Sequence, residues 1–464
     1  MTDAASGDAT TIATAVRGGT LTARATTEAA LARIAAHDHA LGAFTDVTAA
    51  RALAKADAVD AVRAAGRDPG PLAGVPFAVK NLFDLAGVTT RAGSKINRGN
   101  PPAGRDATLV ENLEAAGAVC VGALNMGEYA YDFTGENVHD GPSRNPHDTT
   151  RMSGGSSGGS GTAVAAGLVP LALGSDTNGS IRVPASLCGL FGLKPTFGRL
   201  SRARTFPFVA SLDHLGPLAR SASDLALAYD VLQGPDRDDP TLAARLLEPT
   251  LPALGRGTAG LRIAVAGGYF TERAEPEALA AVRRCAEALG ATGEVLLPEA
   301  HRARAAAYLI TATEGAALHL DRLRERPEDF DPAVRDRLLA GAMIPAAWVT
   351  RAHKFRRWFR DEVGHLFQSV DVILAPATPC VAPRLGQTTM VLGRETLNVR
   401  ANLGLFTQPI SFIGLPVAAV PVWSESPLPI GVQVIGPAWR EDVVLRVAAA
   451  LEHAGICSAR HVRR

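Results

Sequence analysis

Cysteine is scarce in this 464-residue chain, and the five cysteines lie far apart. They form no C-x-x-C pair and no other spacing that is typical of metal ligands: Cys120, Cys188, Cys285, Cys380 and Cys457. Disulfide scaffolds and zinc modules carry their cysteines close together in such patterns. The sequence therefore supports neither, and we expect no metal and no other cofactor.

An excess of charge of one sign is also missing, because 47 Lys and Arg residues stand against 46 Asp and Glu residues. A protein that binds a polyanion presents a basic patch, and no long basic block runs along this sequence. One helical stretch does gather basic residues, namely Arg351, Lys354, Arg356, Arg357 and Arg360. Charge runs of this kind are usually solvated helix faces, so we expect no nucleic-acid partner.

Long hydrophobic runs are absent as well. The most apolar stretch, residues 163–174, is shorter than the ~20 residues that a membrane helix needs, and Pro170 interrupts it. The N-terminal residues carry an acidic side chain where a signal peptide needs Lys or Arg, and they lack an unbroken apolar segment. We therefore expect a cytoplasmic protein without a membrane span.

Glycine, proline and small aliphatic residues are plentiful. The chain contains 46 Gly and 30 Pro, and a hydrophobic fraction of 47% with 5% aromatic residues makes its apolar mass mostly Ala, Val and Leu. This composition is typical of a large globular protein and excludes collagen, coiled coil and disorder. At the usual ~100 to 200 residues per domain, either two or three domains or one large α/β body would fit.

Helical and strand-like patterns alternate along the chain. Residues 10–67 are typical of an Ala-rich helical segment, and the apolar run 75–79 predicts a buried strand that ends at Lys80. Further helices are predicted at 108–116, 276–289, 329–370 and 441–453, and further strands at 118–121, 261–266, 293–297, 371–375 and 430–435. The alternation predicts an α/β fold.

The densest Gly/Ser run is MSGGSSGGSG, residues 152–161. A flexible linker is disfavoured, because structured segments flank the run. A phosphate-binding loop is disfavoured too, since neither G-x-x-x-x-G-K-[ST] nor the strand and acidic residue of a G-x-G-x-x-G unit is present. A hydrolytic role is the third interpretation, because glycines let a backbone approach an acyl group and a serine in a cramped loop can relay a proton.

The surrounding motifs favour the hydrolytic interpretation. The sequence carries, in order, GVPFAVK at 74–80, GGSSGGS at 154–160, GSDTNGSIRVPA at 174–185 and CGLFGLKP at 188–195. This series closely resembles the amidase signature family, and DVILAPATP at 371–379 and LPIGVQ at 428–433 extend the likeness. The resemblance covers about residues 12–451. It implies a single α/β body, a large mixed β-sheet covered by helices on both faces, with a helical segment (1–68) on an amidase signature domain (69–464).

The resemblance also implies a Ser-Ser-Lys catalytic triad. Carried over position by position, Lys80 ends the first motif, Ser156 is the first serine of the Gly/Ser run, and Ser180 closes DTNGS as the nucleophile. Ser180 follows Ser156 by 24 residues, which agrees with the family pattern and not with a shift to Ser157. In this scheme Ser156 passes the proton between Lys80 and Ser180.

Elementary chemistry supports these roles. A serine hydroxyl becomes a good nucleophile only when a base takes its proton, and a lysine acts as that base only when neutral. Lys80 at the end of an apolar strand is a suitable base, because burial lowers the pKa of a lysine. The oxyanion of the intermediate needs backbone donors, which the resemblance assigns to Thr177, Asn178, Gly179 and Ser180.

Two residues of this region have open roles. Asn178 departs from the family, because many members have glycine there, and its side chain could touch the substrate. Arg182 matches a family arginine that could be structural or could bind substrate. Arg182 is the arginine that the sequence places near the nucleophile, so we count it as a candidate clamp for an anionic substrate.

A Ser-His-Asp triad is the alternative, because GGSSG at 154–158 fits G-x-S-x-G, and Asp176 and His214 follow in the order of an α/β-hydrolase. A nucleophile elbow needs an apolar strand before it, whereas residues 144–153 are polar, so the context disfavours this triad. Cys188 is more typical of a small core residue than of a nucleophile.

The segment NMGEYAYDF, residues 125–133, lies where family members line the acyl pocket, so Ala130 and Tyr131 are candidate wall residues, and 311–319 could add another wall. A tyrosine tip in a small cavity suits a short polar substrate. KNLFD at 80–84, AGSKIN at 92–97, RNPHD at 144–148 and FPFV at 206–209 resemble one branch of the family, the large subunits that hydrolyse 1-carboxybiuret.

That branch implies release of ammonia and 1,3-dicarboxyurea through an acyl-Ser180 intermediate. It also implies a small helical AtzG-like partner subunit, and hence a hetero-oligomer. Two other hypotheses stand beside it: the glutaminase subunit of a tRNA-dependent amidotransferase, and a non-catalytic binding subunit. The presence of Lys80, Ser156 and Ser180 together argues against the second.

Overall fold

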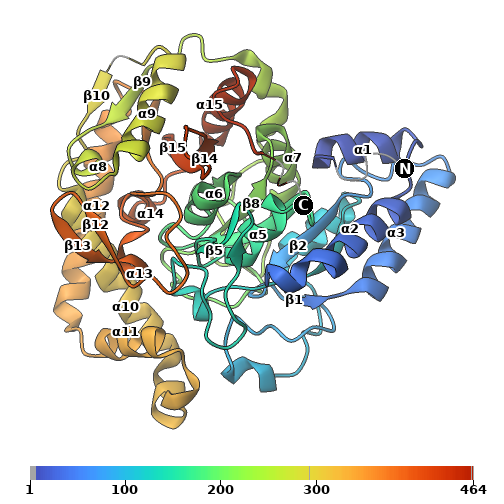
Figure 1. Ribbon diagram of the computed structural model, residues 1–464, viewed down its shortest axis with the longest axis horizontal. Helices are drawn as coiled ribbons and strands as arrows, with labels where there is room; N and C mark the ends of the chain where they lie inside the picture. Colours follow the sequence, from blue (N-terminus) through green and yellow to red (C-terminus); the bar gives the residue numbers. More distant parts are fainter. Residues whose placement is uncertain (1–6, 292, 461, 463–464) are drawn as a thin grey trace.

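One long mixed sheet organises the fold, seen in a computed structural model that describes residues 7–291, 293–460 and 462 (Figure 1). Its 11 strands lie in the spatial order β1 (Phe44–Val47), β3 (Val119–Leu124), β2 (Pro76–Lys80), β6 (Leu171–Asp176), β8 (His214–Ala219), β7 (Phe191–Lys194), β14 (Val417–Val422), β15 (Ile430–Ile435), β11 (Val372–Pro376), β9 (Ile263–Ala266) and β10 (Gly293–Val295). Two small hairpins stand apart from it: β4 (Arg144–Asn145) with β5 (Asp148–Met152), and β12 (Thr389–Leu392) with β13 (Glu395–Asn398).

Two parallel groups of strands lie in the sheet, and an antiparallel group separates them. β2 pairs in parallel with β3 and β6, and β9 pairs in parallel with β10 and β11. Between these groups, β6, β8, β7, β14, β15 and β11 follow one another in antiparallel pairs. β2 and β6, which end at Lys80 and Asp176, therefore have their carboxyl ends at the same edge of the sheet.

The α-helices of the described residues are α1 (Ala9–Arg17), α2 (Ala23–His37), α3 (Ala49–Ala64), α4 (Thr108–Ala115), α5 (Gly158–Ala165), α6 (Arg182–Cys188), α7 (Ala222–Leu232), α8 (Tyr269–Glu272), α9 (Pro276–Ala288), α10 (Ala300–Glu325), α11 (Pro332–Ala342), α12 (Ala346–Leu366), α13 (Val399–Asn402), α14 (Gln408–Phe412) and α15 (Glu441–His453). Short 3-10 turns are η2 (Asp38–Ala40), η3 (Ile96–Gly99), η4 (Glu128–Ala130), η5 (Leu251–Arg256) and η6 (Pro327–Asp329). No helix in this part of the chain has the length and apolarity that crossing a membrane requires.

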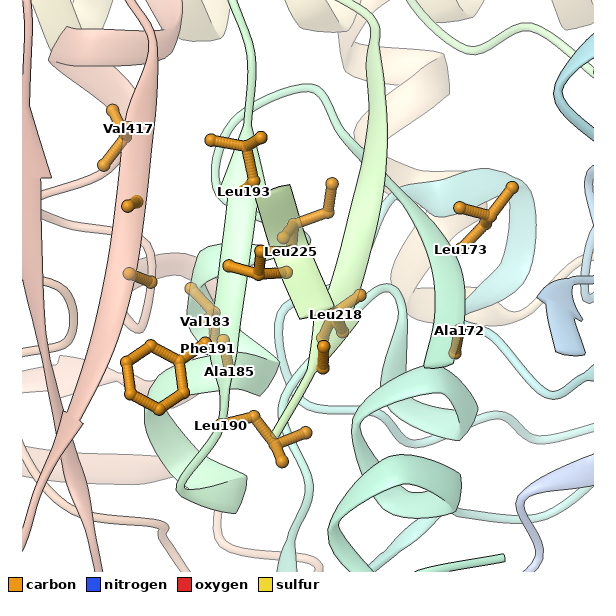
Figure 2. Close-up of a cluster of buried hydrophobic side chains, with 14 of the residues drawn as sticks. Ala172, Leu173, Val183, Ala185, Leu190, Phe191, Leu193, Leu218, Leu225 and Val417 are labelled. Carbon is orange, nitrogen blue, oxygen red and sulfur yellow. The ribbon is translucent and has the colours of Figure 1, made fainter. Parts of the chain in front are cut away.

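Helices cover both faces of the sheet. On one face α6 approaches so closely that a Cβ added to Gly192 of β7 would lie 3.0 Å from the Cβ of Ala185. On the other face, α7 places Leu225 near Leu193 of β7, whose side chain alternates with Gly192 (Figure 2). α15 in turn packs against α7. Because both faces are covered, β6, β8, β14 and β15 are buried along their whole length, and apolar residues follow one another in them without alternation.

The N-terminal segment joins this sheet through a strand. The prediction that residues 10–67 are helical is wrong at β1, which pairs with β3 and forms the edge of the sheet. A buried hydrogen bond from Thr26 Oγ1 to the Gly74 carbonyl, at 2.6 Å, ties α2 to the start of β2. The division into 1–68 and 69–464 stays a prediction, although these contacts join the two parts.

Most other predicted elements are confirmed within a few residues. They are β2, α4, β3, β9, α9, β10, β11, β15 and α15. The single helix predicted over 329–370 is instead two helices, α11 and α12. Pro345 lies between them, and proline has no backbone N–H with which to form the hydrogen bond that would continue α11.

Candidate active site

Lys80, the last residue of β2, is fully buried. Its Nζ donates hydrogen bonds to Ser156 Oγ at 2.6 Å and to Ser175 Oγ at 2.9 Å. Burial lowers the pKa of Lys80 to about 7, although three more distant carboxylates act in the opposite direction. Lys80 therefore reaches its neutral form near neutral pH, and only the neutral amine can accept a proton.

Ser156 lies in a buried loop between β5 and α5, and the peptide bond that links it to Gly155 is cis. The backbone N–H of Gly155 donates to the Phe133 carbonyl at 2.9 Å, and the Ser156 carbonyl accepts from Gly127 N at 3.1 Å. A Cβ added to Gly155 would come within 2.5 Å of Asp132 Oδ2. The Gly/Ser run is thus a close-packed loop that continues into the start of α5, and not a linker.

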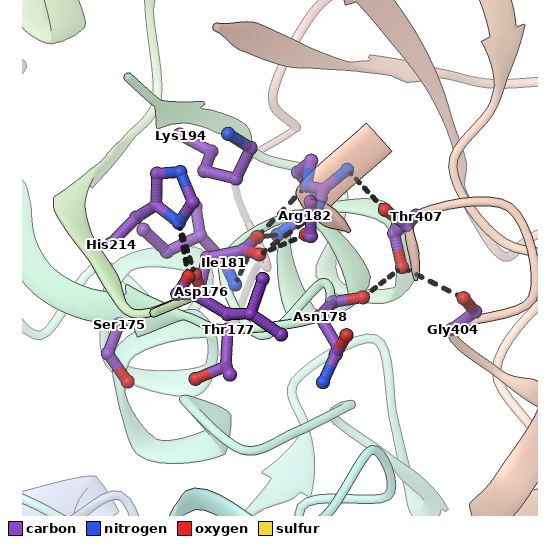
Figure 3. Close-up of polar contacts among 12 residues, drawn as sticks. Ser175, Asp176, Thr177, Asn178, Ile181, Arg182, Lys194, His214, Gly404 and Thr407 are labelled. Atoms are coloured by element: carbon purple, nitrogen blue, oxygen red, sulfur yellow. Dashed lines mark hydrogen bonds and ion pairs between the residues drawn. The ribbon is translucent and has the colours of Figure 1, made fainter. Parts of the chain in front are cut away.

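Ser180 closes a tight turn between β6 and α6 and is buried. Gly179 has a φ of +142°, in the range that favours glycine, and a Cβ there would overlap with Thr407. Thr407 Oγ1 also donates to the Asn178 carbonyl at 2.6 Å (Figure 3). Thr407, which belongs to a distant segment of the chain, therefore fixes the turn that presents Ser180 and the predicted oxyanion donors.

Arg182 lies behind this turn and is completely buried. Its Nε and Nη2 donate to the Asp176 carboxylate at 2.9 Å each, and its other N–H groups donate to the Thr407 carbonyl, Gln433 Oε1 and Ser411 Oγ. All five donors of the guanidinium are thereby used within the protein. Burial alone would raise the pKa of Asp176, but the Arg182 charge holds it well below its usual range.

The prediction that Arg182 binds substrate is therefore wrong. The residue does not line the cavity beside Ser180, and no N–H is left to donate to a ligand. Its partner Asp176 accepts from the backbone N–H of Ile181, the residue directly after Ser180, at 3.2 Å. Arg182 thus positions Asp176, and Asp176 in turn positions the turn that carries Ser180.

The alternative Ser-His-Asp arrangement does not form. His214 Nδ1 faces backbone carbonyls, at 3.0 Å from Asp176 O and 2.6 Å from Leu212 O, and not a carboxylate. Burial lowers the pKa of His214 well below its usual value. Cys188 is a buried core residue, as predicted: its Sγ donates to the Ser153 carbonyl at 3.2 Å, and burial raises the pKa of the thiol.

A cavity of about 580 Å³ opens onto Ser180. The predicted wall residues Ala130 and Tyr131 line it, as does Thr311 of α10 from the predicted 311–319 wall. The side chains of the predicted oxyanion residues Thr177 and Asn178 also reach it. Among the described residues, no three His, Cys, Asp or Glu side chains lie close enough together to hold a metal ion.

Three arginines also line this cavity: Arg304 of α10, Arg337 of α11 and Arg400 of α13. Arg400 forms an ion pair with Asp132 at 2.7 Å, but neither Arg304 nor Arg337 has a carboxylate partner in the described part of the chain. Arg337 donates to the Tyr131 carbonyl and lies 3.8 Å from the centre of the Tyr131 ring. Burial lowers the pKa of both unpaired arginines. Cations without a counter-charge beside a cavity suit an anionic ligand.

Sequence reasoning missed Ser175, Thr407 and these arginines. Ser175 lies inside the quoted GSDTNGS motif, but the motif does not reveal that its hydroxyl faces Lys80. Thr407 and the arginines come from segments without a motif. The one available signal was chemical, because an anionic substrate needs a cationic clamp.

Comparison with known proteins identifies the class of protein. The Amidase family profile matches residues 25–445, so the chain belongs to this family and is an amidase, a hydrolase of carbon–nitrogen bonds. It is 56% identical over 443 residues to the AtzE chain of 1-carboxybiuret hydrolase from Pseudomonas sp. (strain ADP), covering 95% of this chain and 97% of that protein. It is 41% identical over 456 residues to a glutamyl-tRNA(Gln) amidotransferase subunit of Azotobacter vinelandii, covering 92% and 93%.

Solved structures agree with this assignment. An s-triazine catabolic enzyme, described as part of an unexpected vestigial protein complex, matches with a TM-score of 0.97 and 55% identity over 98% of this chain and 100% of that chain. The structure of 6-aminohexanoate cyclic dimer hydrolase complexed with substrate matches with a TM-score of 0.86 and 28% identity, covering 100% and 99%. The expected amidase signature fold, an α/β body around a large mixed sheet, is confirmed.

Proposed function

We propose that this amidase hydrolyses 1-carboxybiuret to 1,3-dicarboxyurea and ammonia, with Ser180 as nucleophile and Ser156 and Lys80 as its proton relay. The proposal rests on the cavity, because Ser180 and the three arginines line the same cavity. Such a site suits a small substrate that bears a negative charge away from the bond that is cleaved. The activity named for the Pseudomonas relative supports this substrate.

In the first half of the reaction, Ser180 Oγ attacks the carbonyl carbon of the terminal amide. Its proton passes to Ser156, whose own proton passes to the neutral Nζ of Lys80, 2.6 Å away. The negative charge that develops on the carbonyl oxygen is stabilised by the backbone amides of Thr177, Asn178 and Gly179. The intermediate then collapses, the C–N bond breaks, and the relayed proton goes to the nitrogen, which leaves as ammonia.

In the second half, water attacks the acyl-Ser180 ester, and the same relay takes a proton from that water. The ester bond breaks, Ser180 regains its proton, and 1,3-dicarboxyurea leaves. Throughout, Arg304, Arg337 and Arg400 hold the carboxylate of the acyl part.

The test measures ammonia release by the purified protein from 1-carboxybiuret, biuret, malonamide and glutamine, with and without a co-expressed small subunit. We expect the highest kcat/KM for 1-carboxybiuret. Glutamine as the best substrate would overturn the proposal.

The glutaminase subunit of a tRNA-dependent amidotransferase is the second candidate, and the 41% identity to such a subunit favours it. Glutamine also carries a carboxylate that the arginines could hold, but this function would require partner subunits and an ammonia channel. The substrate comparison above separates the two candidates. A non-catalytic binding subunit, the third hypothesis, predicts no ammonia release from any of the four compounds.

We further propose that the enzyme works in the cytoplasm with a small helical partner subunit of the AtzG-like type. The description of the structurally similar enzyme as part of a protein complex supports a hetero-oligomer. Native mass spectrometry of the co-expressed proteins should detect both chains in one particle. A fully active protein that contains this chain alone would contradict the proposal.

A further inference from the structure

The side chain of Asn178 lies in the cavity wall, two residues before Ser180, and is 6% exposed. Its Nδ2 donates to Thr311 Oγ1 of α10 at 2.9 Å. Its Oδ1 is buried and has no hydrogen-bond partner among the described residues. A buried carbonyl without a donor is unfavourable, so its presence beside a nucleophile points to a ligand that supplies the donor.

The direction of the side chain agrees with this view. Figure 3 shows the side chains of Ser175, Thr177 and Asn178 on one side of the turn, with Asp176 and Arg182 on the other. Ser175 accepts from Lys80, and Thr177 and Asn178 line the cavity beside Ser180, so the first group lies on the side of the cavity. The second group supports the turn from behind.

Two hydrogen bonds hold Asn178, one at its backbone carbonyl and one at its side-chain amide. Thr407 Oγ1 fixes its backbone carbonyl at 2.6 Å, and Thr311 fixes its Nδ2. These two bonds leave Oδ1 as the free acceptor of the side chain, and because that atom is buried, a substrate N–H meets it after a small shift of the amide.

The rest of the cavity is rich in donors. Arg304, Arg337 and Arg400 can only donate, and they suit the acceptor oxygens of a carboxylate. An amide oxygen can only accept, so Asn178 Oδ1 selects an N–H or O–H group. The cavity therefore fits a ligand with an anion at one end and an N–H close to the reacting carbonyl. A ureide has that N–H next to its scissile carbonyl, whereas an aliphatic amide has a methylene there.

We propose that Asn178 is a specificity-determining residue whose side-chain carbonyl accepts a hydrogen bond from the N–H that flanks the scissile carbonyl on the acyl side. The site thereby selects ureides over amides that carry a methylene at this position. This inference rests on the proposed function and deepens it, because it assigns one atom of the protein to one atom of the substrate.

The test compares Asn178→Ala with the wild type on substrate pairs that differ only in that group. One pair is 1-carboxybiuret and its analogue with CH₂ in place of the flanking N–H, and the other is biuret and malonamide. Differences in intrinsic reactivity cancel, because each variant is compared with the wild type on the same substrate. We expect kcat/KM to fall about tenfold or more for the N–H member and to change less than about twofold for the CH₂ member.

Two variants of α10 serve as references. Thr311→Val removes the partner of Asn178 Nδ2, so we expect a smaller loss with the same preference for the N–H member. Thr313 lies on the same helix but, unlike Thr311, does not line the cavity. Thr313→Val loses only local bonds to the Leu309 and Ile310 carbonyls, so kcat/KM should not change. Thermal unfolding of each variant checks that it folds.

Equal losses on both members of a pair would overturn the inference, because Asn178 would then support the turn and not recognise the N–H. No loss on either member would overturn it as well. Failure of the proposed function has a different signature, since it appears in the wild type as poor turnover of 1-carboxybiuret. In that case the pair of biuret and malonamide still decides the role of Asn178.

Discussion

The two sides of the active site differ in how completely the protein satisfies their polar groups. Behind the proposed nucleophile Ser180, Arg182 uses all five N–H donors on protein acceptors, and Asp176 is bound by that guanidinium and by backbone N–H groups. In the cavity, Asn178 Oδ1 has no hydrogen-bond partner and Arg337 has no carboxylate partner among the described residues. The supporting side is therefore complete within the protein, whereas we propose that the substrate completes the recognition side.

This difference predicts different consequences of substitution. Changes behind the nucleophile should lower the stability of the fold, because they leave buried charges without partners. Changes in the cavity should leave the fold intact and raise KM, because their partners lie on the substrate.

The largest effect is expected for Ser180→Ala, which removes the proposed nucleophile. We expect kcat for ammonia release to fall by about 10⁴-fold or more, with no change in the thermal unfolding temperature. Ser369→Ala, which changes an exposed serine at the end of α12, is the matched control and should retain full activity. Unchanged ammonia release in Ser180→Ala would refute the catalytic assignment for any amide substrate.

Arg182→Met removes a buried cation and leaves the Asp176 carboxylate uncompensated. The free energy of unfolding should fall by about 3–5 kcal/mol, measured by urea denaturation. Adding Asp176→Asn should recover part of that loss, since the buried negative charge then disappears. A stable Arg182→Met enzyme with a raised KM would instead mean that Arg182 binds the substrate.

Arg337→Gln removes an unpaired cation from the cavity. We expect KM for 1-carboxybiuret to rise about 30- to 100-fold with little change in kcat, and KM for uncharged biuret to change little. Arg335→Gln is the control on the same helix, because Arg335 pairs with Glu328 and Asp336 and does not line the cavity. Equal increases in KM for both substrates would show that Arg337 does not recognise the carboxylate.

The smallest effect concerns pH. Because burial lowers the pKa of Lys80 to about 7, a growing fraction of Lys80 is protonated as the pH falls below that value. The protonated amine cannot accept the relayed proton, so kcat/KM should fall about tenfold for each pH unit on the acid side and level off above the pKa. Steady-state rates measured across this range test the prediction, and a flat profile would exclude Lys80 as the base.

The parts of the fold that could be predicted from the sequence are those with a strong local pattern. β2 and β15 are short apolar runs, and α15 has well-marked ends, so the structure confirms all three. β1 has only four residues and is partly exposed, which leaves almost no pattern inside an Ala-rich helical stretch. β1 forms a strand because it pairs with β3, and the residues of β1 alone do not reveal that partner.

The sequence by itself determined the candidate catalytic set, because Lys80, Ser156 and Ser180 stand in motifs with fixed content and order. Only the tertiary structure decided what the arginines do. A guanidinium acts on whichever acceptors lie within hydrogen-bond distance, and for Arg182 these include Gln433 Oε1, from a strand near the other end of the chain. Arg337 reaches the cavity because α11 packs against the turn that holds Tyr131, and that contact likewise joins segments far apart in sequence.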